Sequence, residues 1–206
     1  MKLTERTIVD LLAQFRASSP TPGGGSAAAL AGAVGASLLA MVASMPKHRA
    51  ASEEDVDRLQ AAARRTAEIC DRLTALVDSD SDAYDAVVEA YTLPRASETE
   101  KAARSARIQQ ALSGAVDVPL DVMRRCAEAI EAGAVVATFG NPNAASDVGV
   151  ALELLVAGAR GAKLNVDINL ASLKDSTSVA RIAGQAATLE AECAAGAAAA
   201  RARLSA

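Results

Sequence analysis

Four aspartates crowd the stretch VDSDSDAYDAV at 77–87. Carboxylates at such spacing usually form a solvated helix face, and on a wheel of about 100° per residue Asp78, Asp82 and Asp85 do share one side. Asp80 falls instead in the middle of an apolar stripe that also carries two tyrosines. Because a carboxylate there is costly without partners, two interpretations stand. Asp80 is either a structural residue bonded to a tyrosine hydroxyl, a backbone amide or an arginine, or a site carboxylate with a shifted pKa.

A glycine loop, PTPGGGS at 20–26, opens the next candidate site. Gly23, Gly24 and Gly25 would let the backbone approach a ligand closely, and the free amides of a following helix favour an anion. No lysine follows the glycines and no strand precedes them, so neither a nucleotide-binding P-loop nor a dinucleotide fingerprint is indicated. The alternative is a flexible helix start with Ser26 as its cap.

Asparagines supply a third group of candidate side chains. Asn165 and Asn169 are four residues apart, so a helix would place them on one edge. Facing inward, they would offer hydrogen-bond donors and acceptors to a flat heterocycle; facing outward, they would have no functional meaning. Asn141, Asn143 and Asp147 cluster in and after GNPN, which is most simply read as turn chemistry.

The elements that must position these residues are predicted to be helices. Alanine dominates the apolar 51% of the chain and aromatics make up only 2%, a composition that favours helix over strand. Thr4 is expected to cap a first helix that puts Ile8, Leu11, Leu12 and Phe15 on one face. Prolines, glycines and capping patterns then predict further helices over 26–45, about 52–93, 97–132 with a kink at Pro119, a stretch after the GNPN turn, a shorter helix after a break at Gly161, and 176–204.

The expected fold is therefore an all-α bundle of about six to eight helices, one of them about 40 residues long, in a single domain over 1–206. Helices this long cannot be covered completely by so short a chain. We therefore expect self-association, with a symmetric homodimer as the commonest arrangement.

Composition also limits the partners. A net charge of −4 with no basic block argues against nucleic acid. One histidine and three well-separated cysteines indicate no metal site and a cytoplasmic protein, and the charged start does not resemble a signal peptide. Residues 23–46 carry no charge and could span a membrane by length, but glycine, alanine and serine insert poorly, so a buried central helix is expected and no membrane partner.

Taken together, these motifs resemble the cyclodeaminase/cyclohydrolase family, which includes the C-terminal domain of formiminotransferase-cyclodeaminase and free-standing methenyltetrahydrofolate cyclohydrolases. The resemblance runs over about 4–175 and is carried by PTPGGGSAAALAGAVGASLLAMV, DSDAYDAVVEAYTLPR, VPLDV, GNPNAASD and GAKLNVDINLASLKD. It implies an all-helical homodimer that acts on the one-carbon bridge of a tetrahydrofolate substrate, with no metal and no tightly bound cofactor.

The family patterns fall on particular residues of this chain. The D-x-x-A-aromatic pattern matches Asp80, Ala83 and Tyr84, the glycine loop matches Gly23 to Ser26, and the element that starts with Asn and ends with Asp matches Asn141 and Asp147. The chain departs from the family after the glycine-loop helix, where MPKHRAASEED at 45–55 replaces a lysine-rich stretch that ends in tyrosine.

The resemblance leads to a mechanistic hypothesis for 5,10-methenyltetrahydrofolate, whose bridge is an amidinium cation. Asp80 would hold that cation and accept a proton from attacking water, and Asp147 would move a proton to the leaving nitrogen to give 10-formyltetrahydrofolate. Arg104 or Arg107 would hold substrate carboxylates. Two alternatives stay open: a formiminotetrahydrofolate cyclodeaminase that releases ammonia, and a non-catalytic helical dimer that binds folate or a protein.

Overall fold

A computed structural model describes residues 1–204 of the chain. It confirms the all-helical prediction, since six α-helices and two short 3₁₀ helices follow one another and no strand occurs within 1–204. The elements are η1 (Leu3–Glu5), α1 (Ile8–Phe15), α2 (Gly24–Ala43), α3 (Glu53–Thr92), α4 (Glu98–Phe139), η2 (Pro142–Ala144), α5 (Ala145–Leu170) and α6 (Ser176–Leu204).

The two longest helices begin where the sequence predicts. Ser52 caps α3 by accepting a hydrogen bond from the Asp55 amide, and Ser97 forms a reciprocal capping box with Glu100 at the start of α4. Helix α3 has 40 residues, as expected. Helix α4 has 42 and runs through the buried Pro119 to Phe139, seven residues beyond the predicted end, because its last turns pack against α2 and α5.

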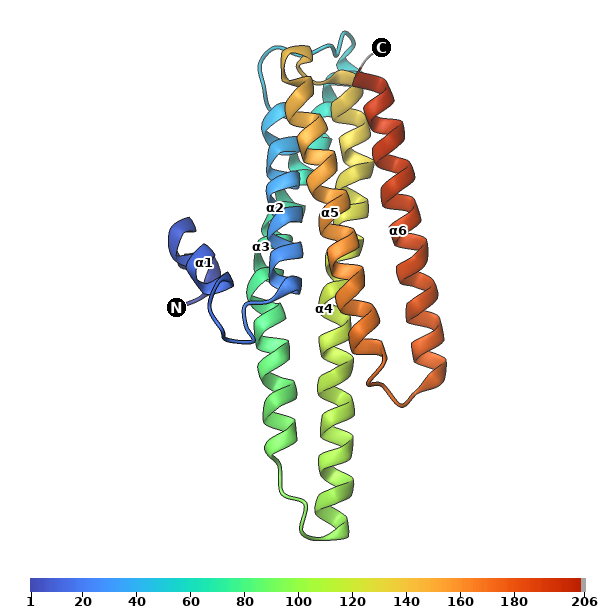
Figure 1. Ribbon diagram of the computed structural model, residues 1–206. Helices are drawn as coiled ribbons and strands as arrows, with labels where there is room; N and C mark the ends of the chain where they lie inside the picture. The colour runs from blue at the N-terminus through green and yellow to red at the C-terminus, as the bar shows by residue number, and fades with distance from the viewer. Residues whose placement is uncertain (205–206) are drawn as a thin grey trace.

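Helix α2 packs between α3 on one side and α5 on the other, and α4 lies behind them (Figure 1). It is the one helix within 1–204 that is long and apolar enough to cross a membrane by length and composition, and 56% of its apolar window is buried in the bundle. Its glycines explain the close packing. A Cβ atom on Gly35 would lie 2.8 Å from the Ala151 carbonyl oxygen of α5.

The predicted helix break at Gly161 is wrong, because α5 is continuous through this position. A Cβ atom at Gly161 would lie 3.2 Å from the Ala28 Cβ of α2. The glycine therefore allows two helices to approach each other instead of ending one of them.

The N-terminal segment differs most from expectation. Helix α1 is capped by Thr7, not Thr4, and it stands away from the bundle (Figure 1). Of the apolar face predicted for it, Leu11 is buried, whereas Ile8 and Leu12 are 78% and 53% exposed. An eight-residue helix is marginal in water by itself, so α1 depends on what its ends are attached to.

Helices α3 and α4 extend past the other helices as a two-helix arm (Figure 1). A small apolar cluster within this arm is separate from the main core and consists of Ala90, Ile108, Ala111 and Leu112. The cluster lies directly beside the cavity described next, because Leu112 belongs to both.

Candidate active site

A cavity of about 300 Å³ opens where the N-terminus of α2 meets α3, α4 and α5; we call it the Asp80 cavity. Four helices and the loop before α2 contribute to its wall, so residues far apart in sequence meet there. The lining residues are Pro20, Thr21, Gly23, Gly24, Gly25, Asp80, Ala83, Tyr84, Val87, Leu112, Ala115, Asn165 and Asn169.

The Asp80 carboxylate is held at the start of α2. Its Oδ2 atom accepts a hydrogen bond from the Ser26 backbone amide at 2.8 Å and one from the Ser26 hydroxyl at 3.0 Å. Ser26 itself is fully buried, and its hydroxyl also lies 2.9 Å from the Val77 carbonyl oxygen. Both interpretations of Asp80 therefore apply. It is bonded to a backbone amide, as a structural residue would be, and it lines a cavity, as a site carboxylate would.

Burial raises the pKa of Asp80 above its ordinary value of 3.8, and the two hydrogen bonds from Ser26 offset part of that rise. No hydrogen bond to the other carboxylate oxygen, Oδ1, and no ion pair to Asp80 occurs within residues 1–204. The raised pKa makes this carboxylate a stronger proton acceptor than an exposed aspartate.

The glycine loop makes room for this carboxylate. A Cβ atom at Gly25 would lie 2.0 Å from Asp80 Oδ1, closer than any real side chain could be, so only glycine fits there. The helix begins after Gly23, and Ser26 lies in its first turn, so the expectation that Ser26 is the cap is wrong. The anion that the free amides of this helix attract is, in part, the side chain of Asp80 itself.

The two asparagines of α5 face the cavity, as the inward-facing interpretation requires. Asn165 donates its side-chain amide to the Gly161 carbonyl at 2.9 Å, and Asn169 donates to the Ala115 carbonyl at 2.7 Å. These bonds direct both amide groups and leave each Oδ1 atom as an acceptor. Tyr84 is 41% exposed at the edge of the same cavity.

Three predicted site residues lie elsewhere in the chain. Arg104 belongs to the arm. Its guanidinium donates a hydrogen bond to the Tyr91 carbonyl oxygen at 2.9 Å and lies over the Tyr91 ring, 5.5 Å from the ring centre. Asn141 caps η2 by accepting a bond from the Asn143 amide, and Asp147 lies in the first turn of α5. Asp147 precedes Asn165 by 18 residues, about 27 Å of helix, so the expected pairing of Asp147 with Asp80 does not form within one chain.

Asp78 has a role that the sequence did not reveal. Its carboxylate accepts hydrogen bonds from the Leu3 amide at 2.6 Å and the Thr4 hydroxyl at 2.7 Å. It therefore anchors the N-terminal segment and is not part of a purely solvated stripe. A helical wheel could not show this, because the partner comes from a segment more than 70 residues away.

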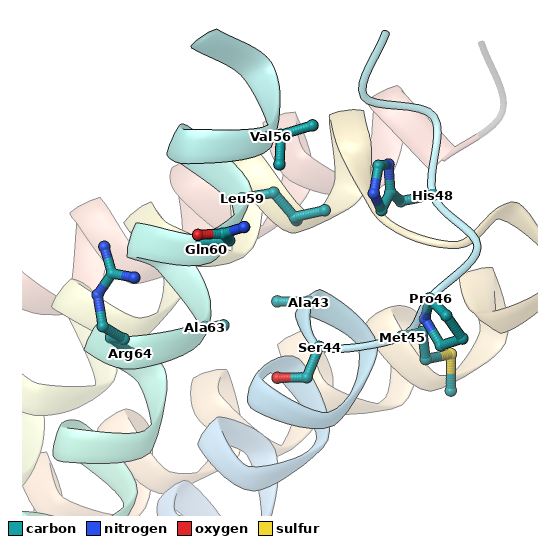
Figure 2. Close-up of a pocket in the computed structure, with 10 residues that line it drawn as sticks. All are labelled: Ala43, Ser44, Met45, Pro46, His48, Val56, Leu59, Gln60, Ala63 and Arg64. Carbon is teal, nitrogen blue, oxygen red and sulfur yellow. The ribbon is translucent and has the colours of Figure 1, made fainter. Parts of the chain in front are cut away.

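A second cavity, of about 330 Å³, lies at the opposite end of α2, where the segment after this helix turns back over the start of α3 (Figure 2). The residues that line it are Ala43, Ser44, Met45, Pro46, His48, Val56, Leu59, Gln60, Ala63 and Arg64. Nineteen residues of α2, about 28 Å, separate this end from Gly24. The departure from the family at 45–55 is therefore remote from the Asp80 cavity of the same chain.

No three histidine, cysteine, aspartate or glutamate side chains within residues 1–204 lie close enough together to hold a metal ion. The side chains present in the Asp80 cavity are a carboxylate, two amides, a phenol, the Thr21 hydroxyl and apolar groups. This set can bind a cationic heterocycle and move a proton.

Comparisons with known proteins agree with this chemistry. A profile of the formiminotransferase-cyclodeaminase family matches residues 7–188. The chain is 43% identical to the methenyltetrahydrofolate cyclohydrolase of Methylorubrum extorquens, over 82% of this chain and 81% of that protein. It is 34% identical to the formimidoyltransferase-cyclodeaminase of Mus musculus over 84% of this chain, which spans only 32% of that longer protein.

The fold is also that of a solved relative. The crystal structure of formiminotetrahydrofolate cyclodeaminase from Thermotoga maritima matches with a TM-score of 0.86 and 27% identity, over 99% of this chain and 98% of that one. With the family profile over 7–188, these matches show that the chain belongs to the formiminotransferase-cyclodeaminase family.

Proposed function

We propose that this protein is a methenyltetrahydrofolate cyclohydrolase, which converts 5,10-methenyltetrahydrofolate to 10-formyltetrahydrofolate. The observation that carries the proposal is the Asp80 carboxylate, half-buried in a cavity and without a cationic partner within residues 1–204. The methenyl bridge of the substrate is an amidinium cation, so the bound substrate would be the cationic partner of this carboxylate. The similarity to the Methylorubrum extorquens cyclohydrolase supports the same reaction.

The reaction needs water, one proton acceptor and one proton donor. Water attacks the bridge carbon, a C–O bond forms, and a proton of that water passes to Asp80. The hydroxyl of this adduct then loses its remaining proton and becomes the formyl C=O as the bond between the bridge carbon and N5 of the pterin breaks; the electron pair of that bond stays on N5, which takes up a proton. Asn165 and Asn169 would orient the pterin through their Oδ1 acceptors, and Tyr84 would cover one of its faces.

A second candidate activity is the cyclodeaminase reaction, in which formiminotetrahydrofolate releases ammonia and closes the same methenyl bridge. The structural match to the Thermotoga maritima cyclodeaminase favours it. Both reactions pass through one tetrahedral carbon between two nitrogens. The Asp80 cavity therefore suits either, and an assay must decide between them.

We further propose that the chain acts as one domain, as a homodimer, in the cytoplasm, with a tetrahydrofolate derivative as substrate and no tightly bound cofactor. Large apolar side chains exposed on α1, α3 and α5 support self-association. The three cysteines are free, which suits a reducing compartment.

The test is a pair of assays on the purified protein. Loss of the ultraviolet band of methenyltetrahydrofolate is followed at mildly acidic pH, where uncatalysed hydrolysis is slow, and ammonia release from formiminotetrahydrofolate is measured in parallel. A cyclohydrolase accelerates the first reaction. Acceleration of the second alone would identify a cyclodeaminase, and acceleration of neither would leave a non-catalytic folate- or protein-binding dimer.

A further inference from the structure

The face of α3 that lines the Asp80 cavity continues beyond the cavity along the arm. Asp80, Tyr84 and Val87 line the cavity, and Tyr91 extends the same series, with spacings of four, three and four residues. Residues at these spacings share one face of a helix. The Tyr91 side chain is 52% exposed, so this face leads from the cavity to an open aromatic ring.

The facing side of α4 continues in the same direction. Ala115 and Leu112 line the cavity, and Ile108 and Arg104 follow at spacings of three, four and four residues. The two series meet at their far ends. The Arg104 guanidinium lies 5.5 Å from the centre of the Tyr91 ring and donates a hydrogen bond to the Tyr91 carbonyl oxygen.

The Arg104 guanidinium has unused hydrogen-bond donors. Its Nε atom is buried without a hydrogen-bond partner, and no salt bridge to Arg104 occurs within residues 1–204. Glu100, one turn earlier, accepts hydrogen bonds from the backbone amides of Ala96 and Ser97 instead. Arginine carries five N–H donors in a fork that matches a carboxylate, so this side chain is equipped to bind an acid from outside the chain.

Lys174, in the loop between α5 and α6, supplies a second cation beside Arg104. Its Nζ atom donates to the Ser105 hydroxyl at 3.1 Å, and its backbone amide donates to the Gln109 side chain at 2.8 Å, so the loop is held against α4. The neighbouring Asp175 does not neutralise it, because that carboxylate accepts hydrogen bonds from the first turn of α6. Two cations without a salt bridge among residues 1–204 thus lie at adjacent positions of α4.

We propose that Arg104 and Lys174 bind the carboxylates of the glutamyl tail of the folate substrate and that Tyr91 lies beside its p-aminobenzoyl ring; we call these three residues the tail site. This inference rests on the proposed function, which places the pterin at Asp80. Arg104 is eight residues from Leu112 in the cavity wall, about 12 Å of helix. An extended p-aminobenzoylglutamate is about as long as three extended residues, roughly 10–11 Å, so it spans this distance.

Substrate and protein are then complementary in charge along their length. The methenyl bridge is cationic and meets the Asp80 carboxylate, and the glutamyl end is anionic and meets Arg104 and Lys174. A folate bound in the reverse direction would place like charges together, so the tail site also fixes the orientation of the substrate. The tail does not change during the reaction, and its contacts should therefore lower KM without altering kcat.

Kinetics with two substrates test the tail site. One is 5,10-methenyltetrahydrofolate, and the other is the methenyl derivative of tetrahydropteroate, which lacks the glutamate. Arg104→Gln and Lys174→Gln should each raise KM for the folate about tenfold, the worth of one charge-assisted hydrogen bond, with kcat unchanged, and should leave KM for the pteroate as in wild type. An unchanged KM for the folate, or an equal rise for both substrates, overturns the proposal.

The matched control is Arg124→Gln. Arg124 is a half-buried arginine of the same helix, about 30 Å from Arg104, and donates to the Gln185 side chain. Its replacement removes the same charge and should change KM for neither substrate. A rise equal to that of Arg104→Gln would mean that net charge, not the tail site, determines the affinity.

Binding without turnover separates the tail site from the assigned reaction. Titration calorimetry with 5-formyltetrahydrofolate should show about tenfold weaker binding to Arg104→Gln than to wild type, and Arg104→Lys, which keeps the charge, should recover part of the loss. This result without turnover of either one-carbon substrate overturns only the proposed function. Equal affinity of wild type and Arg104→Gln, with Lys174→Gln also unchanged, overturns the tail site, and no binding by wild type overturns both.

Discussion

At the residue scale, Asp80 combines a structural and a chemical task. It accepts a hydrogen bond from the Ser26 amide at the start of α2, and it lines a cavity. Burial raises its pKa above the ordinary value of an aspartate. We therefore expect that replacing this carboxylate with a neutral isostere lowers activity more than it lowers the stability of the fold.

Asp80→Asn should lower kcat/KM by about 10²- to 10⁴-fold, the range typical of a lost proton-transfer group, without loss of the fold. Circular dichroism and the methenyltetrahydrofolate assay measure the two effects. The exposed Asp85→Asn is the matched control and should retain full activity. An Asp80→Asn variant with wild-type turnover would place the chemistry on another residue.

The raised pKa of Asp80 also sets the sign of a stability effect. The native protein holds this proton more tightly than the unfolded chain, so the free energy of unfolding contributed by Asp80 falls as pH rises from about 3.8 through the raised value. Chemical denaturation of wild type and Asp80→Asn should therefore show the variant gaining relative stability across this window. A difference that moves the opposite way with pH would contradict the assigned pKa direction.

Gly25→Ala should displace the Asp80 carboxylate, because the added Cβ would overlap Oδ1 at 2.0 Å. We expect a loss of about 1–3 kcal/mol in unfolding free energy, as for other overpacked positions, together with a loss of activity. Gly184→Ala is the matched control. Nothing lies within 4 Å of a Cβ at Gly184, which is inside a helix, so this change should stabilise the protein by about 0.5–1 kcal/mol.

At the scale of elements, a carboxylate of α3 anchors the N-terminal segment through two hydrogen bonds. Asp78→Ala removes the acceptor of both the Leu3 amide and the Thr4 hydroxyl. We expect amides of residues 1–15 to exchange faster with solvent, because α1 is too short to be stable alone. Hydrogen exchange measures this, and protection over 116–137 should not change. Equal protection of 1–15 in Asp78→Ala and in the control Asp85→Asn would mean that other contacts hold this segment.

At the scale of the whole molecule, the arm of α3 and α4 is less supported than the bundle. Its separate cluster has only four buried side chains, whereas the main core joins all of the helices from α2 to α6. Amides of 84–92 and 98–106 should therefore exchange faster than those of 59–77 and 116–137. Hydrogen exchange across the full chain tests this. Equal protection would show that a partner copy covers the arm.

Helical content, the limits of α3 and the unusual position of Asp80 followed from the sequence by itself, because they depend on capping, composition and a repeat of 3.6 residues. Those signals are local, so neighbouring residues are enough to express them. The meeting of Asp80 with Gly25, Asn165 and Asn169, the continuity of α5 through Gly161 and the anchoring role of Asp78 were decided only by the tertiary structure. Each of these depends on which distant helix lies opposite, and helix packing, unlike helix formation, is determined by contacts between residues that are far apart along the chain.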